Sequence, residues 1–239
     1  MNFKHINYDL GYADLSSETL STGRTYETPD GERYPSITTV LSVNSKKSIE
    51  AWRKRIGNEE ADRISYRAST RGTAVHEICE KYVDNDPDWD KFLSVDKTTG
   101  VETLKKRTPD LIASFMQLKP ILDERLTTVY AQEVPLYSHY LGVAGRVDCV
   151  GIFDGKLSII DYKTSKKKKP YKFVTNYFMQ EAFYAIAWEE ITKEPITQLV
   201  TIISVDGDDP QVFIEHRDDW SKSLIDTITK YKEDMYKIS

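Results

Sequence analysis

Residues 145–163 have the sequence Gly-Arg-Val-Asp-Cys-Val-Gly-Ile-Phe-Asp-Gly-Lys-Leu-Ser-Ile-Ile-Asp-Tyr-Lys. Two runs rich in β-branched residues flank the dipeptide Asp154-Gly155, which favours the two-residue turn that joins antiparallel strands. A turn of that length places Phe153 opposite Lys156, and counting outward places Asp148 opposite Asp161. The stretch therefore predicts a β-hairpin with a defined register.

This register gathers the polar side chains of the hairpin on one face. Directly opposite residues share a face, with Cβ atoms about 4.5–5.5 Å apart. Asp148 and Asp161 then lie side by side, and Lys163 shares their face with Arg146 across the ladder. The opposite, buried face is expected to hold Val147, Cys149, Ile160 and Tyr162.

Two facing carboxylates repel each other unless a cation compensates them. Oxygen ligands from two acids suit Mg²⁺ or Mn²⁺, and a neighbouring lysine can orient or deprotonate a water and stabilise charge developing on a phosphate. The alternative is a solvated hairpin face on which Asp161 and Lys163 are simply a neighbouring ion pair. From the hairpin alone the two interpretations carry about equal weight.

Apolar spacing and turn residues outline the remaining elements. In the first half we expect a hairpin at 24–34 that turns at 29–31, a helix starting near Ser36, another capped by Ser48 and running through Trp52, a helix at 71–83, a loop-rich insertion at 84–109 and a helix at 110–125. In the second half we expect strands at 127–137, 143–153 and 156–163, a helix at 176–191, strands at 196–205 and 212–216, and a helix from about 220.

This order of elements predicts an α/β fold with a central mixed β-sheet flanked by helices and a helical N-terminal region. We expect residues 1–125 to form that region and 126–239 to form the core, the two making one compact unit.

Composition is typical of a globular chain, with 39% hydrophobic and 30% charged residues. The net charge of −5 conceals seven lysines against one acid in 156–172 and six acids against one arginine in 206–219. A basic stretch of this kind can still bind phosphates. Two cysteines are too few for a disulfide framework, and the polar N-terminus lacks a targeting signal, so we expect a cytoplasmic protein.

Asp148 followed by Asp161-Tyr162-Lys163 resembles the signature of the PD-(D/E)XK nuclease superfamily. Three further segments resemble its RecB-like exonuclease branch: a Gly-x-x-x-His helix start in 71–76, Gln-x-x-x-Tyr in 180–184, and Pro-Ser-Ile-Thr-x-Val-Leu in 35–41. That last segment, with Asp-Cys-Val at 148–150 and Asp-Tyr-Lys-Thr-Ser at 161–165, is similar to the mitochondrial genome maintenance exonucleases. The resemblance covers roughly Tyr34 to Trp188 and implies a restriction-endonuclease-like core, here from a phage or bacterial relative.

The resemblance implies a catalytic set of Asp148, Asp161 and Lys163. It makes His76 and the backbone carbonyl of Tyr162 metal ligands beside the two aspartates, and an imidazole ligand favours Mn²⁺. Glu133, on the preceding strand, is a weaker candidate ligand. Gln180 and Tyr184 share a helix face and would orient the lysine, a water or DNA. The competing interpretations are a structural histidine, an exposed strand acid, and a packed helix with a polar edge.

Several residues are candidates for contact with DNA or for support of the site. Hydroxyls at a helix start bind phosphates readily, although capping alone explains Ser36. Lysines directly after the second hairpin strand can hold a DNA backbone, although such runs are usually only solvated. The candidates are Ser36, Thr38, Arg71 ahead of the His76 helix, Arg146, Lys166, Lys167, Lys168 and Lys169. Trp52, Tyr66 and Tyr82 can stack on bases, but each fits a core position better.

These features predict a Mg²⁺- or Mn²⁺-dependent exonuclease that hydrolyses single-stranded DNA from a free end, in DNA replication, recombination or repair. Its partner is DNA, and no replication or recombination protein can be named from the sequence. A duplex-resecting exonuclease or structure-specific endonuclease on the same core is the alternative within enzymes. A non-catalytic DNA-binding subunit, or a metal protein that does not bind nucleic acid, is the alternative outside them.

Overall fold

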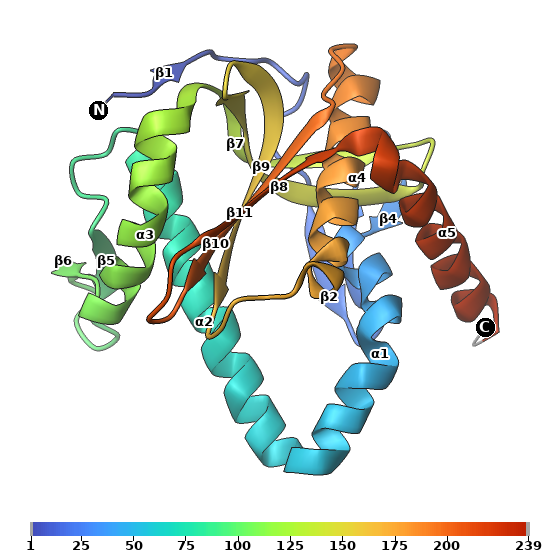
Figure 1. The fold of residues 1–239 in the computed structure, drawn as a ribbon, viewed down its shortest axis with the longest axis horizontal. Coiled ribbons are helices and arrows are strands. Elements are labelled where there is room, and N and C mark those ends of the chain that lie inside the picture. The colour runs from blue at the N-terminus through green and yellow to red at the C-terminus, as the bar shows by residue number, and fades with distance from the viewer. Residues whose placement is uncertain (1, 238–239) are drawn as a thin grey trace.

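A six-stranded mixed β-sheet forms the centre of the chain, in the order β1-β7-β8-β9-β10-β11. The structure is a computed structural model that describes residues 2–237 (Figure 1). The strands are β1 (Lys4–His5), β7 (Leu126–Ser138), β8 (Val143–Phe153), β9 (Lys156–Ser165), β10 (Gln198–Val205) and β11 (Gln211–His216). β1 and β7 run parallel, as do β9 and β10, while the other neighbouring pairs run antiparallel.

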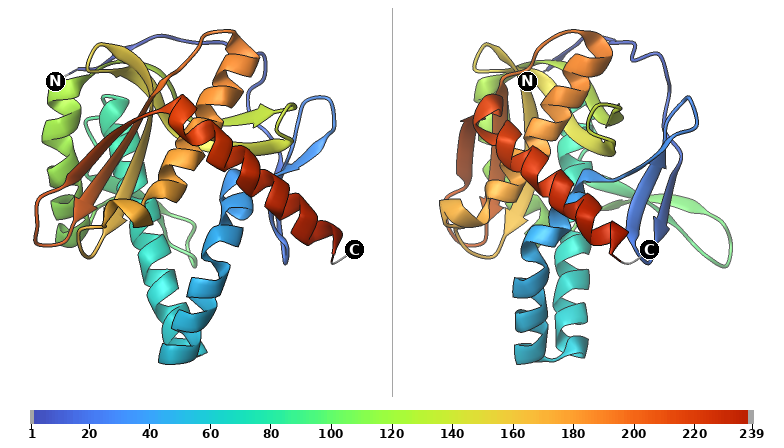
Figure 2. Two further views of the ribbon diagram at one scale, coloured as in Figure 1. Left: turned by 45° about the vertical axis from the view of Figure 1, so that its right-hand side comes forward. Right: turned by 90° about the vertical axis from the view of Figure 1, so that its right-hand side faces the viewer.

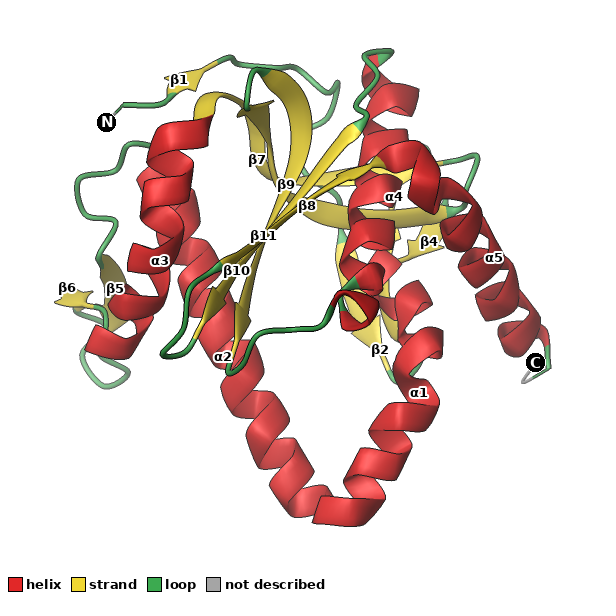
Figure 3. Cartoon of the chain, in the orientation of Figure 1, coloured by secondary structure: helices red, strands yellow, loops and turns green. Residues whose placement is uncertain are grey.

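Helices cover both faces of this sheet (Figures 1 and 3). They are α1 (Ile37–Ile56), α2 (Asn58–Val83), α3 (Pro109–Arg125), η1 (Tyr171–Phe173), α4 (Thr175–Thr192) and α5 (Arg217–Tyr236). One core cluster joins Ile159 to Phe183 of α4 and Leu224 of α5. The other joins Ile160 to Phe115 of α3. Burial of a side chain the size of Phe115 contributes about 1.5–3 kcal/mol. The predicted α/β class with a mixed sheet flanked by helices is therefore confirmed.

The hairpin turn has the predicted geometry. Asp154 and Gly155 have φ angles of 51° and 76°, as a two-residue type I′ turn requires. Phe153 pairs with Lys156, and the ladder continues in that register to Cys149 opposite Ile160. Cys149, Ile160 and Tyr162 pack together on the α2–α3 side as expected. Val147 does not join them: it packs in the cluster on the α4 side instead.

The N-terminal third holds more strand than expected. The predicted hairpin is present as β3 (Gly23–Glu27) and β4 (Arg33–Pro35), with β2 (Ser17–Leu20) as a third strand. The predicted loop at 84–109 contains a second hairpin, β5 (Lys91–Val95) and β6 (Glu102–Lys106). Ser48 does not start a helix: it lies inside α1 and donates a hydrogen bond to the Ser45 carbonyl at 2.8 Å. The final helix starts three residues earlier than predicted, at Arg217.

α1 and α2 extend away from the sheet as the two arms of a V, and they meet at Gly57, far from the sheet (Figures 1 and 2). Arg53 and Asp62 form an ion pair of 2.7 Å between the arms near the tip. Because residues 62–70 of α2 are exposed apart from the half-buried Ile64, their sequence has no apolar stripe that would have revealed a helix. This is why α2 begins thirteen residues before the predicted start at 71. None of the helices in residues 2–237 is suited to cross a membrane.

Candidate active site

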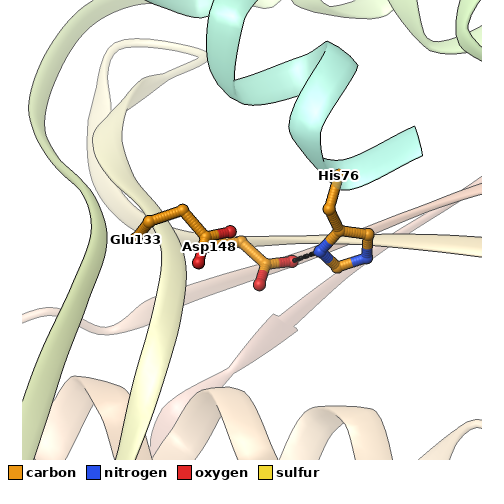
Figure 4. A group of neighbouring side chains, drawn as sticks. All are labelled: His76, Glu133 and Asp148. Carbon is orange, nitrogen blue, oxygen red and sulfur yellow. Dashed lines mark ion pairs between the residues drawn. The ribbon is translucent and has the colours of Figure 1, made fainter. Parts of the chain in front are cut away.

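Three residues with metal-ligating atoms converge from three different elements (Figure 4). They are His76 of α2, Glu133 of β7 and Asp148 of β8, and one ligand atom of each lies within 4.8 Å of the others. His76 Nδ1 is 3.3 Å from Asp148 Oδ2. The group lies beside the hairpin's polar face, so the long α2 is positioned to contribute its imidazole to a site on the sheet.

Glu133 reaches this group because of the β7–β8 register. Gln132 pairs with Cys149 and Val134 pairs with Val147, which leaves Glu133 opposite Asp148. Its φ of 47° lies in the left-handed region, an uncommon conformation for a residue with a Cβ atom and one that often marks functional positions. The signal for Glu133 in the sequence is weak, because β7 and β8 are joined by a longer loop and their ladder contains two bulges.

The last pair of the β8–β9 ladder is Cys149 with Ile160, so Asp148 is the first residue of β8 beyond the ladder. The backbone N–H of Tyr162 donates to Asp148 Oδ2 at 2.9 Å, so a carboxylate takes a hydrogen bond that the ladder would otherwise use. The predicted pairing of Arg146 with Lys163 does not form. Arg146 instead lies opposite Pro135 of β7 and makes an ion pair of 2.6 Å with Asp14. The role of the Tyr162 backbone carbonyl as a metal ligand stays a prediction.

Asp161 and Lys163 form a buried ion pair next to the three converging residues. Their side chains are 2% and 18% exposed, and the Lys163 ammonium lies 5.2 Å from the centre of the Tyr177 ring. Asp161 therefore faces the lysine, and it is not among the three residues whose ligand atoms converge. Gln180 contacts the other carboxylate oxygen of Asp161: the Nε2 atom of Gln180 lies 3.5 Å from Asp161 Oδ1 and 3.4 Å from the Tyr184 hydroxyl.

Burial and close charges shift the pKa values throughout the site. Burial, together with the charge of Asp148, raises the pKa of Glu133 to about 7. Burial raises the pKa of Asp161 to about 6, against the opposing charge of Lys163. Burial alone would lower the pKa of Lys163, but Asp161 and Asp148 outweigh it and raise it. Burial also acts to lower the pKa of His76, but the charge of Asp148 acts in the opposite direction and the pKa of His76 is raised. Burial is the largest single influence on each of these pKa values, and the charge of Asp148 contributes to all four.

A further carboxyl group, that of Glu181, lies on α4 behind Asp161. Glu181 is fully buried, and its Oε1 accepts a hydrogen bond from Thr201, the β10 partner of Asp161. Burial and the charge of Asp161 raise its pKa well above the usual value for glutamate. Sequence reasoning missed this residue because a charged residue next to Gln180 is normally assigned to an exposed helix face.

Three of the proposed DNA-contact residues, Arg71, Ser36 and Thr38, make contacts within the protein. Arg71 does not precede the His76 helix: it lies inside α2, paired with Asp206 and donating to Ser114 Oγ at 2.7 Å. His76 is likewise in the second half of α2, not at its start. Ser36 caps α1, accepting from the Thr39 N–H at 3.1 Å, and its hydroxyl lies 3.0 Å from that of Thr38.

The lysine run follows β9 and divides into two groups. Lys168 pairs with Asp208 at 2.7 Å, and the backbone N–H of Lys169 donates to Gln211. Lys166 and Lys167 are exposed. Among the stacking candidates, Tyr82 is a core residue beside Phe115, whereas Tyr66 is 74% exposed.

The chain was compared with known proteins. Residues 50–235 match the family model of the PD-(D/E)XK nuclease superfamily. Human mitochondrial genome maintenance exonuclease 1 is 27% identical over 146 residues, which are 57% of this chain and 38% of that protein. A crystal structure of a candidate exonuclease from Eubacterium rectale superposes with a TM-score of 0.41 at 14% identity, over 70% of this chain and 66% of that one. The family match spans most of the chain, which therefore belongs to the PD-(D/E)XK nuclease superfamily.

Proposed function

We propose that this protein is a metal-dependent exonuclease that hydrolyses single-stranded DNA from a free end, in DNA replication, recombination or repair. The observation that carries the proposal is the convergence of His76, Glu133 and Asp148 beside the Asp161–Lys163 ion pair. Their combination suits the hydrolysis of a phosphodiester.

The three converging residues fit a divalent cation. Two carboxylates and one imidazole supply the oxygen and nitrogen ligands that Mg²⁺ or Mn²⁺ accepts, with a nitrogen ligand favouring Mn²⁺. Such an ion would polarise the phosphate and lower the pKa of a water molecule. Asp148 is held for this role by the Tyr162 N–H and by His76, both at Oδ2, which leaves Oδ1 for the ion.

Lys163 is the residue we assign to the reacting phosphate. One of the three hydrogens of its ammonium group is directed to Asp161, and the others can orient a water or stabilise the charge that develops on a phosphate oxygen. Asp161 would fix the lysine and, with the Tyr162 carbonyl, complete the ion's ligands. Gln180 and Tyr184 would position Asp161 from α4, because Gln180 contacts both.

The preference for a single strand with a free end rests on the V formed by α1 and α2. Its α1 arm carries four exposed basic residues: Lys54 and Arg55 near the tip, and Lys46 and Lys47 at the middle of the helix. A flexible strand could pass between the arms toward Lys163, whereas a duplex or a strand without an end would be excluded. Phosphate contacts of this kind weaken as salt rises.

A digest of labelled DNA tests the function. We would compare 5′-labelled and 3′-labelled linear single strands, a closed single-stranded circle and a blunt duplex, each with EDTA, Mg²⁺ or Mn²⁺. We expect rapid loss of the linear strands with either ion and no loss in EDTA, with the circle intact. Cutting of the circle at a similar rate would make the protein an endonuclease, and preferred digestion of the duplex would make it a resecting enzyme. Intact DNA in every reaction would refute nuclease activity.

A further inference from the structure

A cavity of about 370 Å³ lies between α2 and the end of β9, a few residues past Lys163. Three arginines of α2 line it at four-residue spacing: Arg63, Arg67 and Arg71. That spacing keeps their side chains on one side of the helix. Lys166 and the hydroxyls of Thr164 and Ser165 line the opposite wall. The lining thus combines four cationic side chains and two hydroxyl-bearing side chains with one carboxylate, that of Glu60.

Two of the four cations are already neutralised. Arg63 pairs with Glu60 at 2.6 Å, and Arg71 pairs with Asp206. Arg67 and Lys166 are exposed, and neither has an ion-pair partner within the part of the chain that the structure describes. The cavity therefore retains an excess positive charge on two of the side chains that line it. An anion with oxygen acceptors fits this arrangement.

The position of the cavity relative to Lys163 identifies the anion. Lys166 is three residues beyond Lys163 and directly follows the end of β9 at Ser165, and at about 3.3 Å per residue the Cα atoms of the two lysines lie roughly 10 Å apart at most. When the scissile phosphate of a DNA strand lies at Lys163, the neighbouring phosphates of the same DNA strand lie within this distance of Lys163. A free phosphate ion has the same acceptor chemistry, so the test must separate the two.

We propose that this cavity binds a backbone phosphate of the DNA strand, one or two nucleotides from the scissile phosphate, through Arg67 and Lys166. The proposal rests on the function proposed above and specifies where the strand is held. The bound phosphate fixes the position of the strand without reading its sequence. It also explains why basic side chains are concentrated here on a chain whose net charge is −5.

Binding without cleavage tests the cavity separately from the nuclease activity. Fluorescence anisotropy of a short labelled single strand in EDTA would be measured across a salt series for wild type and for the double variant Arg67→Gln/Lys166→Gln. Each lost phosphate contact reduces the salt slope for single strands by about 0.7, so the double variant, which loses the one phosphate held by both side chains, should lose about 0.7. The matched control is Lys222→Gln/Lys230→Gln, which removes two exposed lysines of α5 and should leave the slope unchanged.

Two further arms identify the ligand. A neutral methylphosphonate linkage placed next to the scissile linkage should weaken binding by wild type but have little additional effect on the double variant. Inorganic phosphate at millimolar concentration should compete weakly and equally in both proteins. A double variant that keeps the wild-type slope, or strong competition by free phosphate in wild type alone, would overturn the proposal. Normal DNA binding with no cleavage in Mn²⁺ would instead refute the nuclease function while leaving the cavity proposal standing.

Discussion

The backbone N–H of Tyr162 donates a hydrogen bond to Asp148 Oδ2 at 2.9 Å. This bond links β8 and β9 just beyond the point where their ladder ends, and it holds the carboxylate toward His76 and Glu133. A chelating group fixed in this way loses little freedom on binding an ion.

His76 should govern the choice of metal ion. Because imidazole nitrogen favours Mn²⁺ over Mg²⁺, His76→Ala should weaken Mn²⁺ binding by at least about tenfold and Mg²⁺ binding by less. Glu133→Gln should weaken both ions to a similar extent, since it removes an oxygen ligand. Isothermal titration of each ion provides the comparison. Equal loss of both ions in His76→Ala would argue against an imidazole ligand.

Asp161 and Lys163 should make strongly coupled contributions to the free energy of unfolding. Removing one partner leaves a buried charge without compensation, so Lys163→Met and Asp161→Asn should each cost about 3–5 kcal/mol of unfolding free energy. The double variant should recover most of this loss, because no unpaired charge remains. Urea unfolding of all four proteins without metal measures the coupling. Additive losses would mean that the pair does not exist in solution.

Ser36 should stabilise α1 without contributing to DNA binding. Its hydroxyl caps the helix, and replacing such a cap with alanine costs about 1 kcal/mol. Ser36→Ala should therefore lower the midpoint of urea unfolding and leave the affinity for a labelled single strand unchanged. Thr229→Ala, on the exposed side of α5, is a suitable control. A drop in DNA affinity at unchanged stability would assign Ser36 to phosphate instead.

Asp206 should contribute to the loss of stability in acid. The hydrogen bond from Arg71 lowers the pKa of Asp206, so its contribution is fully present above about pH 4, the ordinary aspartate value. It is lost as pH falls through the lowered folded-state pKa. Asp206→Asn should thus lose less thermal stability than wild type between pH 7 and about 3. The same loss in both proteins would contradict this assignment; Asp226→Asn on α5 serves as the control.

The sequence predicted the hairpin and the first part of its register because Asp154-Gly155 favours a two-residue turn. The predicted pairs Asp148–Asp161 and Arg146–Lys163 lie beyond the last pair of the ladder, Cys149–Ile160. The sequence also predicted α4 and five strands of the sheet, β7 to β11, whose apolar runs are long, but not the two-residue edge strand β1. Glu133 is only a weak candidate ligand from the sequence, because bulges shift the β7–β8 register by amounts that no dipeptide encodes. Sequence reasoning missed the first half of α2 and the β5–β6 hairpin because both are mostly exposed and lack apolar periodicity.

The same limits apply to the candidate site. Spacing within one hairpin brought Asp148, Asp161 and Lys163 together, but it could not show that Asp161 faces the lysine. Side-chain direction depends on Gln180 and Glu181, which come from α4. The packing of a distant helix against the strand is a tertiary property that no local pattern carries.

The most direct test of the central claim is the single-turnover cleavage rate of Lys163→Ala on a linear single strand with saturating Mn²⁺. The matched control is Lys230→Ala, an exposed lysine of α5. We predict a loss of about 10²–10³-fold for Lys163→Ala, as for the removal of a donor that stabilises a transition state, with Mn²⁺ binding retained and the control unchanged. A Lys163→Ala protein that cuts at the control's rate would contradict the assigned site.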